Sequence, residues 1–377
     1  MKKRMPAVIA LLALLLGTGA RLSSAADLVV VDTEKGKRQV MCTILEETYR
    51  YIKVKSQDET RTLYTDPKYA EDPSKVSVVV QEVSHGQFPP KFAQADMKRR
   101  NRQYADAFEG YKEAVSEVSG ETMWLAPYLW YYAGEAAFNE AKYAQVEAAD
   151  KQKWYNEAAD KYGKLVEQMK DHYFVPNARL GLGKAQLRLD QFGQARQTLE
   201  AIIESDYPDE VKLKARVWSG RLLVEQGRYD DAIEKLQTLQ RELGEGNAAL
   251  TYMAKLAEAY AWQGKEKFPR AEDLFQEVGL RSPVEEMRAE AYNSRGLSLK
   301  KRGQAREALF SFLRVVVLHH GIRHEYQKAL YHAAITSNEY YSNAPQRARE
   351  LGSRLAHRFP NSYWAKRLKA EAPDLAG

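Results

Sequence analysis

Residues 220–239 read GRLLVEQGRYDDAIEKLQTL. Gly220 opens this stretch, and Ala232 follows it twelve positions later. Large apolar residues then stand four and seven positions after the alanine, at Leu236 and Leu239. This spacing places the alanine and both leucines on one face of an α-helix. The stretch therefore predicts the end of one helix, a turn, and a second helix that packs through an alanine-centred face.

The same alanine-centred pattern recurs along the chain. Its anchoring alanines are Ala107, Ala158, Ala195, Ala232, Ala271, Ala308 and Ala348. Successive anchors are 51, 37, 37, 39, 37 and 40 residues apart. A period of this length is typical of stacked helix pairs, not of a closed globule with one active-site cleft. The repeats therefore favour a binding surface over an enzyme.

A glycine stands twelve residues before three of the anchors, at Gly183, Gly220 and Gly296. Glycine inside a helix costs about 1 kcal/mol relative to alanine. We expect a neighbouring helix to approach closely at these positions, because a close approach would offset that cost.

Glycine, alanine, an apolar residue and then proline, at this spacing, resemble the tetratricopeptide repeat, most closely over 220–239. The resemblance covers residues 92–360 and implies a mainly α, right-handed solenoid of about seven helix pairs after a small all-β module. It also implies a non-catalytic scaffold that binds proteins or peptides and needs no cofactor. The extra residues 141–153 predict an extended first helix in the pair that carries them. The last pair departs from the pattern, with Thr336 in the glycine position and Gly352 in the apolar position.

The flanking segments differ from the repeats in composition. Residues 27–83 contain five short runs rich in β-branched and aromatic residues, which predict a small β module similar to SH3-like or Sm-like barrels. Residues 84–91 hold a glycine and two prolines and are expected to form a linker. Residues 361–377 are expected to form a capping helix and tail, with Asn361 or Ser362 as N-cap.

The first 26 residues have the pattern of a secretory signal peptide: a basic start, an apolar run and a small-residue cleavage site. We expect an exported protein of the periplasm or cell envelope, with no membrane span once the signal is cleaved. The alternative is a signal kept as an anchor. The tail 358–368, RFPNSYWAKRL, resembles repeat ends in envelope-assembly proteins of Gram-negative bacteria.

The charge balance argues against a nucleic-acid partner. The signal segment holds four of the 57 basic residues and none of the 51 acidic ones, so the remaining chain has 53 basic residues against 51 acidic ones. A nucleic-acid binder usually carries a dense basic stripe. The one cysteine, Cys42, cannot form an internal disulfide and is expected to be a small buried side chain.

Binding candidates come from the first helix of each pair, which lines the inside of such a superhelix. By repeat register they are Lys184, Arg188, Arg221, Glu225, Asn293 and Lys300. Lys184 and Arg188 share a helix face and, with Arg221, could form a basic groove for an acidic or C-terminal peptide. The alternative is that they are ordinary solvated charges.

Aromatic residues crowd one helix before the insertion, at Trp124, Tyr128, Trp130 and Tyr131. Tryptophan and tyrosine are common anchors of protein interfaces, although at helical spacing they are more often core. Their density also supports an alternative function, the binding of cell-wall glycan or another polymer through these first helices.

Catalytic and metal-binding motifs are weak. His319, His320 and His324 lie near a predicted helix end without the carboxylate that an H-E-x-x-H motif would add. The sequence shows no nucleophile elbow, phosphate-cradling glycine loop or paired cysteines. We therefore expect neither an enzyme nor a metal site.

Overall fold

The structure is a computed structural model that describes residues 27–377 except 34–35, 57–58, 73, 75, 86–87, 144–147, 245 and 342–344. The predicted signal peptide, residues 1–26, lies outside the described residues. The chain divides into two compact units: Met1–Glu46 with Ile52–Phe88, and Glu47–Tyr51 with Pro89–Gly377. Each unit is described by itself.

The first unit is a closed barrel with the strand order β1-β2-β3-β4-β5. The strands are β1 (Asp27–Thr33), β2 (Gly36–Glu47), β3 (Tyr51–Ser56), β4 (Glu59–Tyr64) and β5 (Val78–Ser84). β1 pairs antiparallel with both β2 and β5, and β4 meets β5 in parallel through Tyr64 and Val79. The predicted small β module is therefore present.

β-Branched side chains fill the inside of this barrel. Val29 and Ile52 are fully buried, and Val54 is almost so. Cys42 is also buried, as its sequence context predicts, and this burial, aided by the charge of Asp27, raises the pKa of its thiol to about 11. The thiol is therefore protonated at neutral pH and serves as a packing group.

The second unit is helical. Its first helices are α1 (Pro90–Arg100), α2 (Tyr104–Val115), the short η3 (Gly120–Leu125), α3 (Ala126–Tyr143), α4 (Ala148–Gln168), α5 (Val175–Arg188), α6 (Phe192–Ile203), α7 (Asp209–Glu225) and α8 (Tyr229–Leu243). The rest are α9 (Ala248–Gly264), α10 (Phe268–Arg281), α11 (Glu285–Lys301), α12 (Ala305–Leu318), α13 (Arg323–Tyr340), α14 (Gln346–Arg358), α15 (Tyr363–Glu371) and α16 (Pro373–Ala376).

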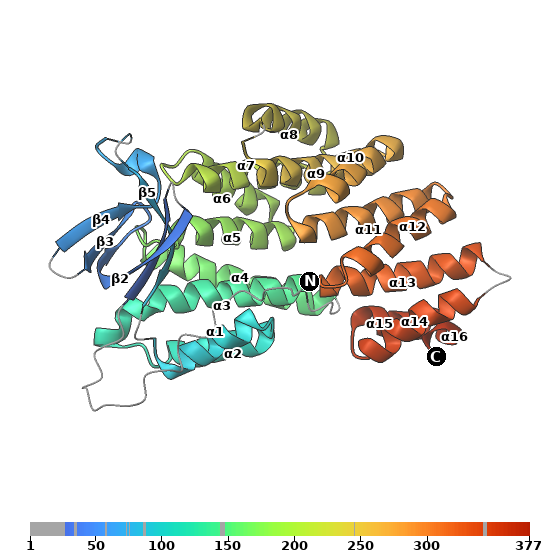
Figure 1. Ribbon diagram of the computed structural model, residues 1–377, viewed down its shortest axis with the longest axis horizontal. Helices are drawn as coiled ribbons and strands as arrows, with labels where there is room; N and C mark the ends of the chain where they lie inside the picture. The colour runs from blue at the N-terminus through green and yellow to red at the C-terminus, as the bar shows by residue number, and fades with distance from the viewer. Residues whose placement is uncertain are drawn as a thin grey trace. The chain divides into compact units, whose positions relative to one another are not determined.

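Helices α1 to α14 form seven successive pairs, which follow one another around an arc in Figure 1. We call the first helix of a pair its A helix and the second its B helix. Each of the seven anchoring alanines lies in a B helix and is fully buried. The stack of helix pairs predicted from the alanine spacing is therefore confirmed.

The A-helix glycines lie where a neighbouring helix approaches closely, as the sequence predicts. A methyl group added at Gly220 would lie 2.5 Å from Cδ2 of Leu236, and one at Gly296 would lie 2.5 Å from Cε1 of Phe312. Both neighbours are the residue four positions after the anchoring alanine. In both pairs, the space left by the missing side chain of the A-helix glycine is filled by a large side chain of the B helix.

The insertion lies elsewhere than expected. The A helix α3 has 18 residues, as α13 does, whereas the B helix α4 has 21 residues against 12 to 15 in the B helices α6, α8, α10 and α12. The prediction of an extended first helix is wrong, because the added residues lengthen the second helix of the pair.

The departures of the last pair have a packing explanation. A methyl group at Gly352 would overlap the backbone carbonyl of Leu375, so glycine here gives α16 room to pack on α14. Ser362 caps α15 by accepting a hydrogen bond from the backbone N–H of Ala365 at 3.2 Å. The end of the stack is therefore covered by α15 and α16, as a terminal repeat requires. Within the described residues, no helix is both long enough and apolar enough to cross a membrane.

Candidate binding groove

The A helices α3, α5, α7, α9 and α11, together with the B helix α4, line a cavity of about 740 Å³, which we call the groove. Its cationic residues are Lys142, Lys151, Lys184, Arg188, Lys214 and Arg221, and its acidic residues are Glu135, Glu286 and Glu290. A cavity of this size is in the range that holds a small ligand or a short segment of a partner chain. The formal charge of the lining is positive, so the groove favours an anionic ligand.

Three of the cations of the groove lie around the ring of Trp218, which belongs to α7. Nζ of Lys184 lies 5.2 Å from the centroid of its ring, and Cζ of Arg221 lies at the same distance. Cζ of Arg188 lies 6.0 Å from the same ring. Cation–π attraction of this kind holds cations near an aromatic ring without neutralising them. The three predicted basic residues therefore meet around one tryptophan that the sequence analysis did not single out.

Two of these cations make no direct ion pair with a carboxylate. Arg188 pairs with Glu225 at 3.3 Å, and Lys214 pairs with Glu210 at 2.6 Å. Neither Lys184 nor Arg221 makes an ion pair with any residue that the structure describes. A charged side chain in a partly closed cavity is costly without a partner, so these two groups form the part of the groove that is readiest to receive an anion.

The pKa of Lys184 reflects this environment. Burial lowers it first, and the nearby charges of Lys214 and Lys142 lower it further, to about 8. Glu135 works in the opposite direction but does not compensate. The lysine is thus still mainly charged at neutral pH, and a bound carboxylate would restore the pKa toward its ordinary value.

The acidic side of the groove is held by its own partners. Burial works to raise the pKa of Glu290, but Arg221 and a hydrogen bond from the hydroxyl of Tyr260 outweigh it, so that the net pKa is lowered. The Tyr260 oxygen lies 2.7 Å from Oε1 of Glu290. Glu290 therefore stays ionised and partly balances Arg221 from α11.

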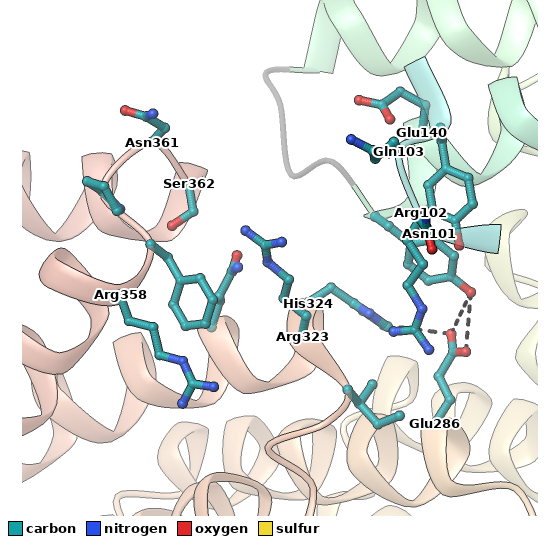
Figure 2. Close-up of a pocket in the computed structure, with 16 residues that line it drawn as sticks. Asn101, Arg102, Gln103, Glu140, Glu286, Arg323, His324, Arg358, Asn361 and Ser362 are labelled. Atoms are coloured by element: carbon teal, nitrogen blue, oxygen red, sulfur yellow. Dashed lines mark hydrogen bonds and ion pairs between the residues drawn. The ribbon is translucent and has the colours of Figure 1, made fainter. Parts of the chain in front are cut away.

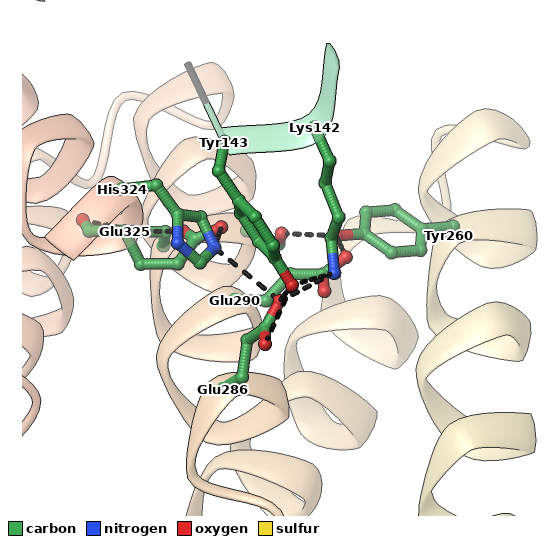
Figure 3. A network of polar contacts seen from close by, with 9 residues as sticks. Lys142, Tyr143, Tyr260, Glu286, Glu290, His324 and Glu325 are labelled. Atoms are coloured by element: carbon green, nitrogen blue, oxygen red, sulfur yellow. Dashed lines mark hydrogen bonds and ion pairs between the residues drawn. The ribbon is translucent and has the colours of Figure 1, made fainter. Parts of the chain in front are cut away.

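Figure 3 shows a second cluster where α3 meets α11 and α13. Nζ of Lys142 lies 2.6 Å from Oε1 of Glu286, and the hydroxyl of Tyr143 donates to the same oxygen at 3.0 Å. The ring of His324 lies 4.6 Å from that of Tyr143, and its Nε2 lies 3.6 Å from Glu286. Lys142 and Glu286 of this cluster line the groove.

The other predicted groove residues lie apart. Glu225 stands beside Arg188, as described above, but Asn293 is fully buried and donates to Oε2 of Glu325 at 2.6 Å. The prediction that Asn293 lies open on the concave face is wrong, because its register in α11 turns it toward α13. Lys300 pairs with Glu339 at 2.9 Å and does not line the groove. Trp218, Lys214 and Lys142 line it instead.

The aromatic residues of the first helices have separate environments. Tyr128 is 1% exposed and donates to Oε2 of Glu47 at 2.6 Å, so the prediction that it forms an interface is wrong: it is core. Tyr131 lines the groove and stacks on Phe174 with a centroid distance of 4.2 Å. Trp124 is 38% exposed, and Trp130 is partly buried.

The three histidines of the sequence analysis do not converge. His319 lies 3.4 Å from Glu285, His320 is exposed, and His324 faces Glu286 and Glu325. In the described part of the chain, no group of three or more histidine, cysteine, aspartate or glutamate side chains is placed to hold a metal ion.

Comparison with known proteins gives one family match. Residues 118–249 match the family described as tetratricopeptide repeat-like domain. No curated protein sequence matches the chain.

Three solved structures resemble the chain at low sequence identity. The apo form of RapI is 12% identical with a TM-score of 0.44, over 74% of this chain and 79% of that chain. The C-terminal part of a TPR repeat-containing protein from Cytophaga hutchinsonii is 16% identical with a TM-score of 0.37, over 73% and 98%. A tetratricopeptide repeat protein from Parabacteroides merdae is 16% identical with a TM-score of 0.39, over 64% and 97%.

The family match spans α3 to α8, which supply Lys184, Arg188, Trp218 and Arg221. The buried alanine anchors continue the same pattern to α14. Residues 118–249 thus form a tetratricopeptide repeat-like domain within a longer stack of helix pairs that follows a small β-barrel.

Proposed function

We propose that this protein is a non-catalytic scaffold of the bacterial cell envelope that binds an acidic segment of a partner protein in its groove. A tetratricopeptide-like fold typically mediates protein–protein interaction, through the concave surface that its A helices create. The observation that carries the proposal is the pair of cations beside Trp218, Lys184 and Arg221, which make no direct ion pair with a carboxylate among the described residues and are only partly balanced by the charges of Glu135 and Glu290.

The chemistry of the groove indicates which segment would bind. Two unpaired cations lie within 5.2 Å of one aromatic ring, beside the apolar side chains of Leu180, Leu256 and Met253. An aspartate, a glutamate or a chain terminus would supply the carboxylate, and a neighbouring apolar side chain would cover Trp218. An extended peptide provides both at adjacent positions.

A pull-down experiment tests the groove. The purified protein and the double variant Lys184→Glu/Arg221→Glu are immobilised and incubated with bacterial envelope extract. We expect the protein to retain partners that a free poly-glutamate peptide elutes, and the variant to lose them. The matched control is Arg196→Glu/Arg241→Glu, which makes the same charge change on exposed arginines of the B helices α6 and α8. Retention of the same partners by the groove variant would contradict the proposal.

The location is tested separately. Residues 1–26 are fused to a reporter phosphatase that is active only outside the cytoplasm. Activity is expected with the native segment, and loss of activity with Leu14→Arg, which interrupts its apolar run. Equal activity of both fusions would contradict export by this segment.

A further inference from the structure

A second cavity, of about 590 Å³, lies where the first helix pair meets the last one (Figure 2). It is lined by the loop between α1 and α2, by the start of α13, and by the segment that joins α14 to α15. It shares Glu286 with the groove, but otherwise its lining is different. We call it the junction cavity.

Three exposed arginines from three different elements are among the residues that line the junction cavity (Figure 2). Arg102 comes from the loop after α1, Arg323 is the first residue of α13, and Arg358 is the last residue of α14. None of the three makes an ion pair with a carboxylate in the described part of the chain. Three guanidinium groups around one cavity indicate an anionic ligand, because arginine donates paired hydrogen bonds to oxyanions.

The two acidic residues of the lining are already engaged. Oε2 of Glu140 accepts a hydrogen bond from the backbone N–H of Ala105 at 3.1 Å, in the first turn of α2. Glu286 is held by Lys142 and Tyr143, as Figure 3 shows. Glu286 is therefore balanced by Lys142, which does not line the junction cavity, and neither carboxylate makes an ion pair with the three arginines.

The aromatic residues hold two of the arginines in place. Cζ of Arg323 lies 5.3 Å from the ring centroid of Phe359, and Cζ of Arg358 lies 5.5 Å from the same centroid. Phe359 is 8% exposed, so it is a fixed part of the core and not a mobile surface side chain. The two exposed guanidinium groups thus share one buried aromatic ring, which favours their positions near the cavity.

Gln327 gives an independent indication of a ligand. It is 5% exposed, lines the junction cavity, and makes no side-chain hydrogen bond with any described residue. Its amide atoms are not among the fully buried polar atoms that lack a partner, so the amide is reached from the cavity, where a ligand oxygen would accept hydrogen bonds from its N–H groups.

The backbone adds a further donor surface. Helix α13 has 18 residues and begins at Arg323 after Ile322, whose side chain cannot cap it. The first N–H groups of a helix attract an anion, and the residues at the start of α13, Ile322 to His324, line the same cavity as Gln327.

We propose that the junction cavity binds a phosphoryl group, carried by a small phosphorylated molecule. Its three oxygens would accept hydrogen bonds from the arginines, from Gln327 and from the start of α13. Phosphate suits this donor set because it offers acceptors in several directions, whereas a single carboxylate offers them in one plane. The proposal is independent of the peptide groove, since the arginines and Gln327 line the junction cavity alone.

Isothermal titration calorimetry on the full protein tests it, with three probes: inorganic phosphate, glucose 6-phosphate with glucose as its control, and vesicles that contain phosphatidic acid. We expect saturable binding of at least one phosphate-bearing probe with a Kd of about 1 mM or tighter, and none of glucose. The probe that binds best distinguishes a free ion, a soluble ester and a lipid headgroup as the source.

Variants locate the site. Arg323→Gln and Gln327→Leu should each weaken binding at least tenfold, with circular dichroism and melting showing that they remain folded. The matched control is Arg306→Gln, an exposed arginine near the start of α12 that also lies against an aromatic ring, that of Phe310; it should bind as the native protein does. The absence of binding by all phosphate probes, or equal weakening by Arg306→Gln, would overturn the proposal. So would loss of binding in Lys184→Gln together with unchanged binding in Arg323→Gln, because the site would then be the groove.

Discussion

Nζ of Lys142, in α3, lies 2.6 Å from Oε1 of Glu286, in α11, although 144 positions separate the two residues in the chain. The ion pair joins the second helix pair of the stack to the sixth one. In a repeat protein, most contacts are between neighbouring helix pairs. This ion pair instead connects two pairs that are far apart in the stack, across its concave side. It also separates the two cavities, since Glu286 lines both.

A double-mutant cycle measures the strength of this ion pair. The side chains of Lys142 and Glu286 are 42% and 30% exposed, so solvent screens their attraction. We expect a coupling energy of about 1 kcal/mol between Lys142→Met and Glu286→Gln in urea unfolding, decreasing as salt is added. The control pair Lys164 and Asp160, within α4, should couple by no more than about 0.5 kcal/mol. A coupling energy of zero across the stack would show that the bridge does not contribute to stability.

The glycine of the A helix gives a second prediction, in which sterics oppose helix propensity. Gly220→Ala would place a methyl group 2.5 Å from Leu236, which is fully buried. We expect a loss of about 1–3 kcal/mol in the free energy of unfolding, because the packed pair must separate. Gly163→Ala is the matched control: it is also helical, nothing lies within 4 Å of the added methyl group, and it should gain up to about 1 kcal/mol. Equal effects of the two substitutions would mean that the close approach at Gly220 is unimportant.

These positions show why the fold was predictable from the sequence. Ala232 and Leu236 belong to one helix, Gly220 to the helix just before it, and the same three residue types return in other pairs. Local spacing therefore contains almost all of the information about the stack.

The groove was only partly predictable. Lys184 and Arg188 could be assigned to one helix face by their spacing, but which face of α11 meets α13 depends on how the two helices cross. Asn293 was misplaced for that reason, and its hydrogen bond to Glu325 shows that it is a packing residue. Trp218 was missed because an aromatic residue in an A helix gives the same sequence signal whether it is core or groove. The junction cavity joins segments more than 200 positions apart, such as Arg102 and Arg323, and no repeat spacing relates them.

Acid stability should depend on His332 of α13. Burial lowers the pKa of His332 first, and the charges of Lys328, Lys300 and Arg367 lower it further, from 6.5 to about 3. Between pH 6.5 and about 3, His332 is therefore protonated in the unfolded chain but stays neutral in the folded chain. Stability is fully present above pH 6.5 and falls as the pH drops through this window, by at most about 1.4 kcal/mol per pH unit from this residue.

His332→Phe tests this contribution, since the ring stacks on Phe312 at 5.2 Å and phenylalanine keeps an aromatic group there. We expect the variant to have a shallower fall of the melting temperature between pH 6.5 and pH 4 than the native protein. His320→Phe, at an exposed position, controls for the exchange itself. Identical pH profiles for the native protein and His332→Phe would contradict the assignment.

Lys184 should also make stability rise with pH, but across an alkaline window. Its pKa is about 8 in the folded protein against an ordinary value of 10.5, so the unfolded chain holds a proton between these values that the folded chain has lost. Stability therefore rises with pH across this window, and the cost of the buried charge is fully present below pH 8. Lys184→Met removes the charge, keeps most of the side-chain volume, and should raise the melting temperature at pH 7 but less so at pH 9.5.

The same residue connects stability with binding. If Lys184 binds a carboxylate of the partner, its buried charge lowers the stability of the free protein but raises its affinity for the partner. An acidic partner should then raise the melting temperature of the native protein at pH 7 more than it raises that of Lys184→Met. Lys366→Met, at an exposed position of α15, is the control for loss of a lysine. A melting temperature of Lys184→Met below that of the native protein at pH 7 would show that the amine is a stabilising member of the fold. Its place beside Trp218 would then be structural, and Arg221 would be left as the unpaired cation of the groove.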